Sequence, residues 1–256
     1  MIDTAGGKPG VDGGLKSVLS ALELLDCFID DEEFGVSELA RRLDVSKSTA
    51  HRLLTTLTAR GYIQQDPESA RYRLGIRVIE LGQLAARRAR LHRTALPLLE
   101  HLRQLTSCTV HLAVPDGADV VYLERLSPIP HMRRFAQVER RIPAHQVSSG
   151  KAIAAFNPEL ATLRRVAGFA RPAGEPPYRT ADFDRSLTEI KARGVAITHD
   201  VIGLGLSSVA VPVRDASGIA RAAISVAGPT VEVAQNTQRF ARLVGAASAK
   251  LERALR

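Results

Sequence analysis

Four polar residues near position 50 have the types and the spacing that can read DNA. His51 and Arg52 follow Lys47 and Ser48 by four residues, which is about one helical turn, so a helix presents all four on one face. Their side chains can form hydrogen bonds with base edges in the major groove, and the cations can pair with phosphates. Backbone N–H groups at the start of a helix also favour a phosphate. The pattern predicts that the N-terminal end of this helix enters the major groove of DNA.

A second, shorter helix is needed to hold the first one in place. Ser46 is the expected cap of the longer helix, which spans residues 47–60. One stripe of this helix is apolar and faces the domain core through Ala50, Leu53, Leu54 and Leu57. The shorter helix covers residues 36–43, with Ser37 as its expected cap and a tight turn at residues 44–45. Residues 36–60 are therefore predicted to form a helix-turn-helix.

Two short strands extend this motif into a wing. Residues 62–65 and 71–74 have strand character and flank a turn at residues 66–70, while a leading helix at residues 18–28 braces the motif. Arg71 and Arg73 are placed to touch the DNA backbone or the minor groove. A helical bundle or protein-interaction module with incidental basic residues is the alternative, but the helix spacing, the wing and the charge all favour DNA binding. The expected DNA contacts are Ser37, Ser46, Lys47, Ser48, Thr49, His51, Arg52, Arg71 and Arg73.

Positive charge is concentrated in the same part of the chain. The formal net charge is +8. Residues 41–93 contain twelve Lys and Arg residues against four acidic residues, whereas residues 1–40 contain two lysines against nine acidic residues. A basic segment on a globular protein indicates a polyanionic partner, most simply nucleic acid. A solvated charged face is the alternative that charge alone does not exclude.

Length and texture divide the chain into two domains. It has 256 residues, about the number that two modest domains need. We expect a disordered lead-in over residues 1–14, a winged helix-turn-helix domain over 15–74, one linker helix over 75–95 and a second domain over 96–256. Pro97 is expected to mark the boundary between the linker helix and the second domain, because proline rarely continues a helix.

Other bulk properties favour a cytoplasmic protein. Hydrophobic residues make up 45% of the chain and charged residues 24%. No apolar run approaches the roughly 18 residues of a membrane span, and the N-terminus lacks a signal pattern. Cys27 and Cys108 are far apart without zinc-type spacing, so we expect two reduced thiols.

The second domain alternates short strands and helices. Strands are expected at residues 109–114, 120–126, 207–213 and 222–226. Helices are expected at residues 98–106, 150–156, 183–193 and 235–255. The Pro- and Gly-rich stretch at residues 168–177 is expected to be a loop.

Segments along nearly the whole chain resemble the IclR family of bacterial transcriptional regulators. They are residues 17–25, 37–62 (SELARRLDVSKSTAHRLLTTLTARGY), 72–75, 142–145, 149–152, 194–196, 205–213 and 224–229. Each segment is weak alone, but their order and spacing together are specific. The resemblance implies an α+β protein with an N-terminal winged helix-turn-helix domain, a linker helix, and a C-terminal GAF-like α/β effector-binding domain with an antiparallel sheet. It also implies dimers that pair into tetramers, pseudo-palindromic DNA operators and a small organic acid as effector.

The resemblance carries a set of effector-binding positions onto this chain. They are Ser148, Ser149, Thr198, Asp200, Leu206, Ser208 and Ser225. Thr198 stands where family members have an acidic residue, and Ala227 stands where a second hydroxyl would follow Ser225. These departures make the implied pocket less polar, so we hypothesise a carboxylate larger than a two- or three-carbon acid, aromatic acids included. Cations at Arg133, Arg134, Arg140 and Arg141 either add charge near the pocket mouth or form a solvated basic loop, which we favour.

Two other classes of function can be weighed against a ligand-controlled regulator. Ser148 and Lys151 match the S-x-x-K spacing of acyl-transfer enzymes, but the S-D-N and K-T-G strings of that chemistry are absent. The same stretch is not a phosphate-binding Walker loop, and the seven histidines show no metal-binding spacing, so we expect no enzyme, cofactor or metal. A structural nucleoid protein would not need the large and varied second domain. We therefore expect an effector that changes operator affinity through the linker helix.

Overall fold

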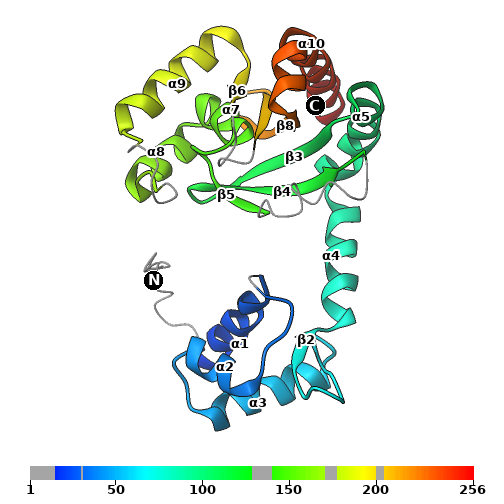
Figure 1. Ribbon diagram of the computed structural model, residues 1–256, viewed down its shortest axis with the longest axis vertical. Helices are drawn as coiled ribbons and strands as arrows, with labels where there is room; N and C mark the ends of the chain where they lie inside the picture. Colours follow the sequence, from blue (N-terminus) through cyan, green and yellow to red (C-terminus); the bar gives the residue numbers. More distant parts are fainter. Residues whose placement is uncertain (1–14, 30, 129–139, 171–177, 200–204) are drawn as a thin grey trace. The chain divides into compact units, whose positions relative to one another are not determined.

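The computed structural model describes residues 15–29, 31–128, 140–170, 178–199 and 205–256 (Figure 1). The expected lead-in, Arg133, Arg134, Asp200 and most of the expected loop at residues 168–177 lie outside these residues. The chain divides into two compact units, Met1–Ala86 and Arg87–Arg256. Among the described residues, no helix is long and apolar enough to cross a membrane.

The first unit is a small helical domain closed by a two-stranded sheet. Its helices are α1 (Lys16–Asp26), a short 3-10 turn (Cys27–Ile29), α2 (Val36–Arg42) and α3 (Lys47–Ala59). Strands β1 (Ile63–Gln65) and β2 (Tyr72–Leu74) pair antiparallel with Ile63 opposite Leu74. Phe34 adds one more rung, because its backbone N–H and C=O both bond to Tyr72. The expected helix-turn-helix and wing are therefore present.

Seven side chains from all parts of this unit form its core. They are Leu24, Phe28, Phe34, Leu39, Leu54, Ile63 and Tyr72. Leu24 and Phe28 of the expected leading helix are buried in this core, so this part of the helix braces the motif. Val18 and Leu22, nearer its start, are 50% and 55% exposed.

The linker is not the single helix expected over residues 75–95. Helix α4 (Ile76–Arg88) ends before Ala89, and α5 (Arg90–Thr106) begins directly after it. Ala89 has an extended backbone (φ −68°, ψ 106°), so the helical hydrogen bonding is interrupted there. Helix α5 packs within the second unit, where the Arg90 guanidinium donates to the carbonyl of Ala254 over 2.9 Å.

Pro97 lies inside α5, so it does not separate two helices as expected. Proline removes one backbone hydrogen bond from a helix interior. Here Ala95 and Leu99 are fully buried and Leu102 nearly so, while Pro97 itself is exposed. Burial of this face outweighs the lost hydrogen bond, so the helix continues through the proline.

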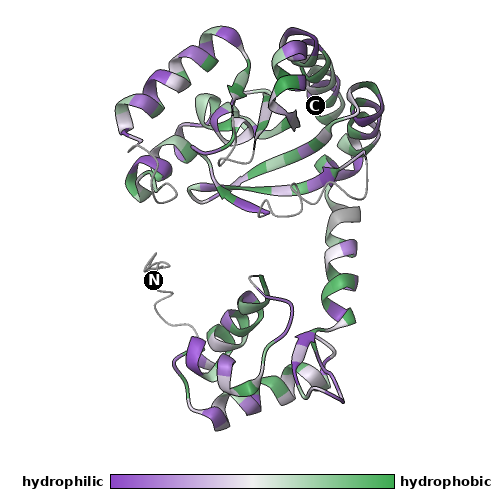
Figure 2. Cartoon of the chain, viewed as in Figure 1, coloured by the Kyte–Doolittle hydropathy of each residue, from purple (hydrophilic) through white to green (hydrophobic). Residues whose placement is uncertain are grey.

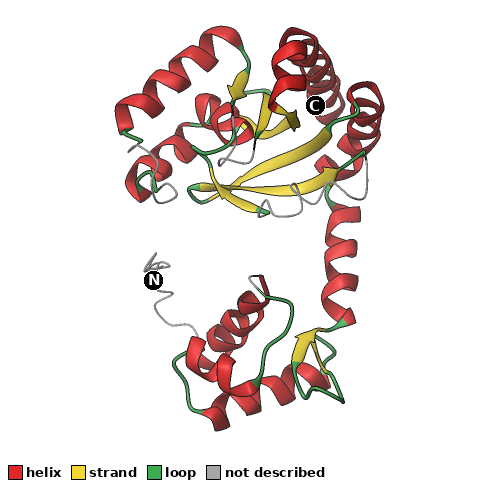
Figure 3. Cartoon of the chain, viewed as in Figure 1, coloured by secondary structure: helices red, strands yellow, loops and turns green. Residues whose placement is uncertain are grey.

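The second unit is a six-stranded antiparallel sheet between two layers of helices (Figure 3). The strands run in the order β5 (Arg141–Pro143), β4 (Asp119–Leu126), β3 (Thr109–Asp116), β8 (Ala220–Pro229), β7 (Leu206–Arg214) and β6 (Ala196–Thr198). The helices are α5, α7 (Ser148–Phe156), α8 (Pro158–Ala167), α9 (Thr180–Arg193) and α10 (Thr230–Leu255). The four expected strands and four expected helices are present with shifted ends, whereas β5, β6 and α8 are not among the elements expected from strand and helix patterns.

Alternating side chains of the strands divide the core into two layers. Val110 and Leu112 of β3 and Ile224 of β8 pack against α5 and α10. Ala113 of β3 and Ala223 of β8 pack on the opposite face, against α7, α8 and α9. Figure 2 shows apolar stretches along β3 and β4 and hydrophilic residues along the outer helix α9. The face toward α7 is the one that also carries buried polar side chains.

Candidate DNA-binding surface and effector site

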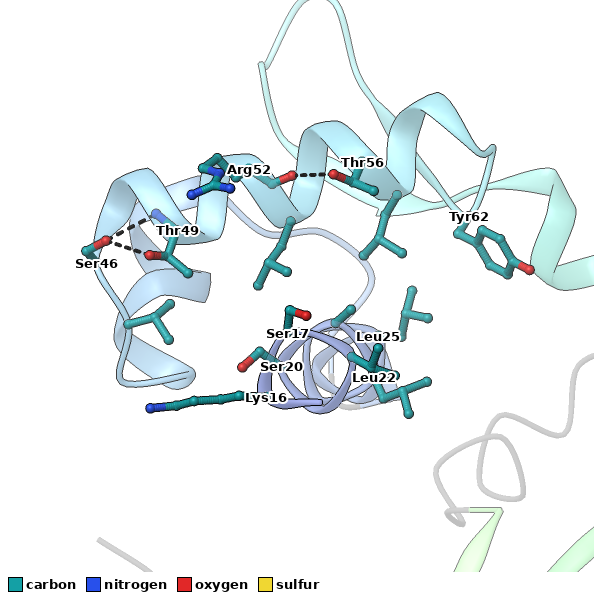
Figure 4. Close-up of a pocket in the computed structure, with 15 residues that line it drawn as sticks. Lys16, Ser17, Ser20, Leu22, Leu25, Ser46, Thr49, Arg52, Thr56 and Tyr62 are labelled. Carbon is teal, nitrogen blue, oxygen red and sulfur yellow. Dashed lines mark hydrogen bonds between the residues drawn. The ribbon is translucent and has the colours of Figure 1, made fainter. Parts of the chain in front are cut away.

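The start of α3 is held by a small network of hydroxyl groups. Ser46 has an extended backbone and its Oγ accepts a hydrogen bond from the backbone N–H of Thr49 over 3.1 Å (Figure 4). The same Oγ lies 2.9 Å from the hydroxyl oxygens of Ser48 and Thr49. Ser46 is therefore the helix cap that the sequence predicted, and it stabilises the first turn of α3.

The first two turns of α3 present an exposed polar face. Lys47, Ser48, His51 and Arg52 are all exposed, whereas Ala50 on the opposite face is fully buried. Within the part of the chain that the structure describes, neither Lys47 nor Arg52 forms an ion pair. The two cations are thus available to an outside anion, which is the arrangement that a DNA-reading helix needs.

The start of α2 differs from the expectation. Gly35, not Ser37, precedes the helix, and its backbone N–H donates to the carboxylate Oε2 of Glu38 over 2.8 Å. This hydrogen bond, together with the charge of Arg71, lowers the pKa of Glu38, although partial burial opposes the shift. Ser37 is an exposed residue inside the first turn of α2, so it does not cap the helix. Its contact with DNA stays a prediction.

The two wing arginines have different surroundings. The guanidinium of Arg71 donates to the carbonyl of Glu33 over 2.8 Å and to the carboxylate of Glu38 over 3.0 Å. Arg71 therefore ties the wing to α2, and its expected contact with DNA stays a prediction. Arg73 is exposed. The wing turn is ordered by Asp66, whose Oδ1 accepts from the backbone N–H of Ser69 over 2.8 Å.

An open cavity of about 890 Å³ lies between α1 and α3 in this unit. Figure 4 shows Ser17, Ser20 and Leu25 of α1 along one side and the helix that carries Arg52 and Thr56 on the other. The exposed residues Val18 and Leu22 belong to the same lining. Sequence reasoning did not find this cavity, because it depends on how α1 packs against α3.

In the second unit, four serines of the expected effector site are buried together on the face toward α7. Ser148 and Ser149 open α7 and are 1% and 0% exposed, and Ser208 of β7 and Ser225 of β8 are 5% and 2% exposed. The Ser148 and Ser208 hydroxyl oxygens are 2.8 Å apart, so the helix start is bonded to the sheet.

The helix start comes close to the preceding loop because residue 150 is glycine. A Cβ atom added at Gly150 would lie 2.2 Å from the carbonyl oxygen of Ala144, a distance that no side chain tolerates. Val147 precedes α7, and no side chain caps the helix. Backbone N–H groups at such a helix start suit a carboxylate. The geometry therefore agrees with an anion-binding role for the Ser148–Ser149 turn.

The remaining expected effector residues lie at the β6–β7 edge of the same face. Thr198 of β6 is opposite Ser208 of β7, and its Oγ1 is buried without a hydrogen-bond partner among the described residues. Leu206 is two residues from Ser208 on the same strand, is 3% exposed, and so shares its face. Asp200 lies outside the described residues. Of the basic loop, Arg140 and Arg141 are exposed, and Arg141 pairs with Asp116.

Three residues on this face were missed by sequence reasoning. The rings of His111 and Tyr122 stack with centroids 4.4 Å apart, and the Tyr122 hydroxyl lies 3.4 Å from the Ser149 Oγ. The Arg125 Cζ is 5.5 Å from the Tyr122 ring centroid. Burial, and next the charge of Arg125, lower the pKa of His111 to about 3, so its imidazole is neutral at pH 7. The alternation of β3 signals His111, but nothing in the sequence signals Arg125.

Neither a metal site nor a reactive thiol is found in the described residues. They contain no group of three His, Cys, Asp or Glu residues that could hold a metal ion. Neither Cys27 nor Cys108 forms a disulfide within the described residues, and Cys108 is buried. Burial, and next the charge of Glu232, raise the pKa of the Cys108 thiol to about 12, so it stays protonated.

Comparison with known proteins covers both units. Residues 17–67 match the IclR helix-turn-helix domain, and residues 83–253 match the C-terminal domain of bacterial transcriptional regulator IclR. The HTH-type transcriptional regulator BhcR of Paracoccus denitrificans is 32% identical over 98% of this chain and 89% of its own length. An IclR regulator structure from Alicyclobacillus acidocaldarius has a TM-score of 0.83 at 26% identity and covers 94% of this chain and 99% of its own.

A further structure carries a ligand. An IclR homologue from Microbacterium hydrocarbonoxydans, solved as a complex with 4-hydroxybenzoate, has a TM-score of 0.79 at 27% identity and covers 94% of this chain and 99% of its own. The relatives are named as transcriptional regulators, a class without enzymatic activity. A DNA-binding winged helix-turn-helix unit and a C-terminal α/β unit, each matching its family model, identify this chain as a member of the IclR family of bacterial transcriptional regulators.

Proposed function

We propose that this regulator controls a catabolic operon in the cytoplasm. Its affinity for DNA falls or rises when a carboxylic acid binds the second unit. One observation carries the proposal. A single chain combines a capped helix, whose exposed cations Lys47 and Arg52 form no ion pair among the described residues, with a buried row of hydroxyl groups beneath a helix start that no side chain caps. The first suits a polyanion, and the second suits a small anion.

On the DNA side, the contacts are proposed to come from the start of α3 and from the wing. Lys47, Ser48, His51 and Arg52 face the major groove, Thr49 and Ser46 hold the first turn, and Ser37 and Arg73 contact the backbone. Arg71 is a further proposed contact, whose guanidinium is also bonded to Glu38. One winged helix reads few base pairs, so affinity and specificity require two copies on a pseudo-palindromic operator.

The second copy also covers apolar surface that this chain leaves exposed. Four apolar residues of α4, namely Ile76, Ile79, Leu81 and Leu84, are 36% to 65% exposed. A helix with that many exposed apolar side chains marks an interaction surface. We propose that α4 and the exposed residues Val18 and Leu22 of α1 pack against a second copy of the chain, which gives a homodimer or a dimer of dimers.

On the effector side, the ligand is proposed to be an organic carboxylate with an apolar or aromatic body. Its carboxylate binds the backbone N–H groups at the start of α7, and Ser208 and Ser225 supply hydrogen bonds from the sheet. Thr198 and Ala227 make this surface less polar than an acidic residue and a second serine would. The 4-hydroxybenzoate complex of the Microbacterium relative supports an aromatic acid.

Signal transmission is proposed to run from β4 into α5. The Nε2 of His92, in the first turn of α5, is 2.9 Å from the Oε2 of Glu124 on β4, and both side chains are largely buried. A shift of β4 on effector binding therefore moves the start of α5 and, through it, α4. Coupling of this kind requires the effector to bind the two states with different affinity. Unchanged operator affinity at saturating effector would show that this mechanism is wrong.

The DNA proposal is tested first by finding the operator. DNA fragments selected by the purified protein are sequenced, and the operon next to the enriched fragments identifies the regulated pathway. A specific regulator should prefer its operator over unrelated duplexes by about a thousandfold or more. Binding to unrelated duplexes within about tenfold of one another would instead indicate a structural nucleoid protein.

The contact face is tested on that operator with Arg52→Ala. Loss of a base-reading arginine should weaken binding by about 1–3 kcal/mol and relax preference at one base pair. Arg60→Ala, the same change at the exposed far end of α3, is the control and should leave operator affinity unchanged. Equal weakening on all sequences would assign Arg52 to a phosphate, and no weakening would remove α3 as the reading helix.

The effector proposal is tested by thermal-shift screening of organic acids. Aromatic or long-chain carboxylates should raise the unfolding temperature of the second unit, because a ligand that binds only the folded state stabilises it. Stabilisation by two- or three-carbon acids alone would contradict a large apolar ligand.

A further inference from the structure

Thr55 lies one helical turn after His51 on α3, and its hydroxyl group contacts His51 at two atoms. The Thr55 Oγ1 donates a hydrogen bond to the backbone carbonyl of His51 over 2.9 Å. The same Oγ1 is 3.5 Å from the His51 ring nitrogen Nδ1. Threonines inside helices often bond the carbonyl four residues earlier. The additional contact with the ring constrains a side chain that is exposed on the polar face of α3.

The two distances decide which group carries the hydrogen in each contact. A hydroxyl has one hydrogen to donate and two lone pairs that accept, whereas a carbonyl oxygen only accepts. The hydrogen of Thr55 is therefore committed to the shorter contact, with the carbonyl. Because the Thr55 oxygen can then only accept from the ring, Nδ1 of His51 carries the ring hydrogen. In a neutral imidazole the other nitrogen, Nε2, then keeps its lone pair.

The acceptor at Nε2 differs from the cationic groups on the same face of α3. Lys47 and Arg52 only donate hydrogen bonds, so they suit phosphates and the acceptor atoms of guanine. An acceptor nitrogen instead requires a donor, and each base pair presents one in the major groove, the exocyclic amino group of adenine or cytosine. Within the part of the chain that the structure describes, Nε2 of His51 has no hydrogen-bond partner.

We infer that Thr55 sets the tautomer of His51, so that His51 Nε2 accepts a hydrogen bond from the amino group of adenine or cytosine in the major groove. The inference rests on the proposed DNA contact of His51 and adds the kind of base atom that His51 reads. Thr55 is a positioning residue in this arrangement, because it acts on DNA only through the His51 ring.

The next residue of α3 supplies a matched control. The Thr56 Oγ1 donates to the backbone carbonyl of Arg52 over 2.8 Å, which is the same backbone hydrogen bond one position further on (Figure 4). Both threonines are exposed. A guanidinium has only donors and therefore no tautomer to select. Thr56→Val thus repeats the loss of a hydroxyl from α3 without any effect on a ring.

The tautomer is measured first, on the full-length protein without DNA. Long-range ¹H–¹⁵N correlation spectra at about pH 8.5, where ordinary imidazoles are neutral, show which ring nitrogen carries the hydrogen. His51→Gln assigns the signals. We expect hydrogen on Nδ1 in the wild type and in Thr56→Val and Thr55→Ser, and a shift toward Nε2 in Thr55→Val. Hydrogen mainly on Nε2 in the wild-type spectrum would overturn the inference without the need for any variant.

The base contact is measured next, on the operator selected by the purified protein. Selection with His51→Ala identifies the base pair whose preference depends on His51. N6-methyladenine or N4-methylcytosine at that pair replaces the amino hydrogen in the major groove by a methyl group and keeps base pairing. The modified operator should bind the wild type about 3- to 10-fold more weakly, since one hydrogen bond is lost. Thr55→Val should lose most of this discrimination, whereas Thr55→Ser and Thr56→Val should keep it.

The contrary outcomes separate this inference from the proposed function. Equal discrimination against the modified operator by the wild type and Thr55→Val would overturn the role of Thr55, while the contact of His51 with DNA would stand. No discrimination by the wild type would overturn the amino group as the atom that His51 reads. If His51→Ala changes neither the selected sequence nor the operator affinity, both the inference and the proposed contact of His51 are wrong.

Discussion

Helices α3 and α7 both begin next to serines, but the two helix starts lie in opposite surroundings. At α3, Ser46 accepts the Thr49 N–H over 3.1 Å, and the side chains that follow are exposed. At α7, no side chain caps the helix, and Ser148 and Ser149 are buried against the sheet. The first helix satisfies one of its backbone donors internally and offers side chains to a partner. The second points its serine side chains toward the sheet, and no side chain caps its first backbone N–H groups.

This contrast fixes what each unit can recognise and how much change it tolerates. A surface of exposed polar side chains suits a large polyanion, whereas a buried row of hydroxyl groups suits a small molecule enclosed by the fold. Substitutions at exposed positions usually alter stability little, while those at tightly packed positions alter it strongly. The largest differences between the two helix starts should therefore appear in stability.

Gly150→Ala should give the largest effect at the buried start. The new Cβ would lie 2.2 Å from the Ala144 carbonyl oxygen, so the loop or the helix must move. We expect the free energy of unfolding of the second unit to fall by about 3 kcal/mol or more. Denaturant unfolding, combined with hydrogen exchange of peptides from β7 and β8, measures this loss and locates it.

Gly82→Ala is the control for this substitution. Gly82 lies in α4 with nothing within 4 Å of its added Cβ, so alanine should leave stability unchanged or raise it by up to about 1 kcal/mol. If Gly150→Ala unfolds at the same denaturant concentration as the wild type, the close approach of α7 to its loop is not what orders the helix start.

The same contrast explains how much of the fold could be predicted from the sequence. The helix-turn-helix is local: the spacing of Ala50 and Leu54 sets the buried face of α3, and Ser46 precedes it as a cap. The interruption of the helix at Ala89 was not predictable, because the start of α5 depends on contacts with α10, which is distant in the sequence. The long-range packing of Leu99 and Leu102 likewise overrides the local preference of Pro97 to end a helix.

At the candidate effector site, family resemblance supplied the serines but not their setting. Ser208 and Ser225 are assigned to neighbouring strands, and the structure brings Ser208 to Ser148. Arg125 could not be found, because strand alternation assigns it to the wrong face unless the bulge at Leu123, where the pairing of β4 with β3 shifts by one residue, is known. Ser37 is not a cap, because α2 begins one residue before it, at Val36. The backbone N–H of Gly35, which precedes the helix, donates to the carboxylate of Glu38.

Acidification should distinguish the two units next. The pKa of His111 falls from 6.5 to about 3 in the folded protein, mainly through burial. Between these values the unfolded chain binds a proton that the folded chain does not, so stability present above pH 6.5 is lost as the pH falls. Each pH unit removes about 1.4 kcal/mol, which amounts to about 2 kcal/mol at pH 5. Unfolding of the second unit at pH 7 and pH 5 measures this loss.

His111→Phe keeps a ring on Tyr122 and removes the titrating group, so it serves as the control. The variant should lose less stability than the wild type between pH 7 and pH 5, by about 2 kcal/mol. An equal loss in both proteins would mean that His111 is not the group that resists protonation, and that its burial on the sheet is wrong.

Ser46→Ala and Ser37→Ala should give the smallest effects and sharpen the comparison at the exposed start. Ser46 accepts a backbone N–H and caps α3, whereas Ser37 lies inside α2 and caps nothing. Removal of a serine cap destabilises a helix by about 1 kcal/mol, so Ser46→Ala should lower the unfolding free energy of the first unit by that amount. Ser37→Ala should change it by less than about 0.5 kcal/mol. Denaturant unfolding gives both values, and hydrogen exchange in the first turn of α3 should rise only in Ser46→Ala. An equal loss of unfolding free energy in the two variants would mean that Ser37 also acts as a cap. The start of α2 would then be stabilised by its own serine, like the start of α3, and not by the carboxylate of Glu38.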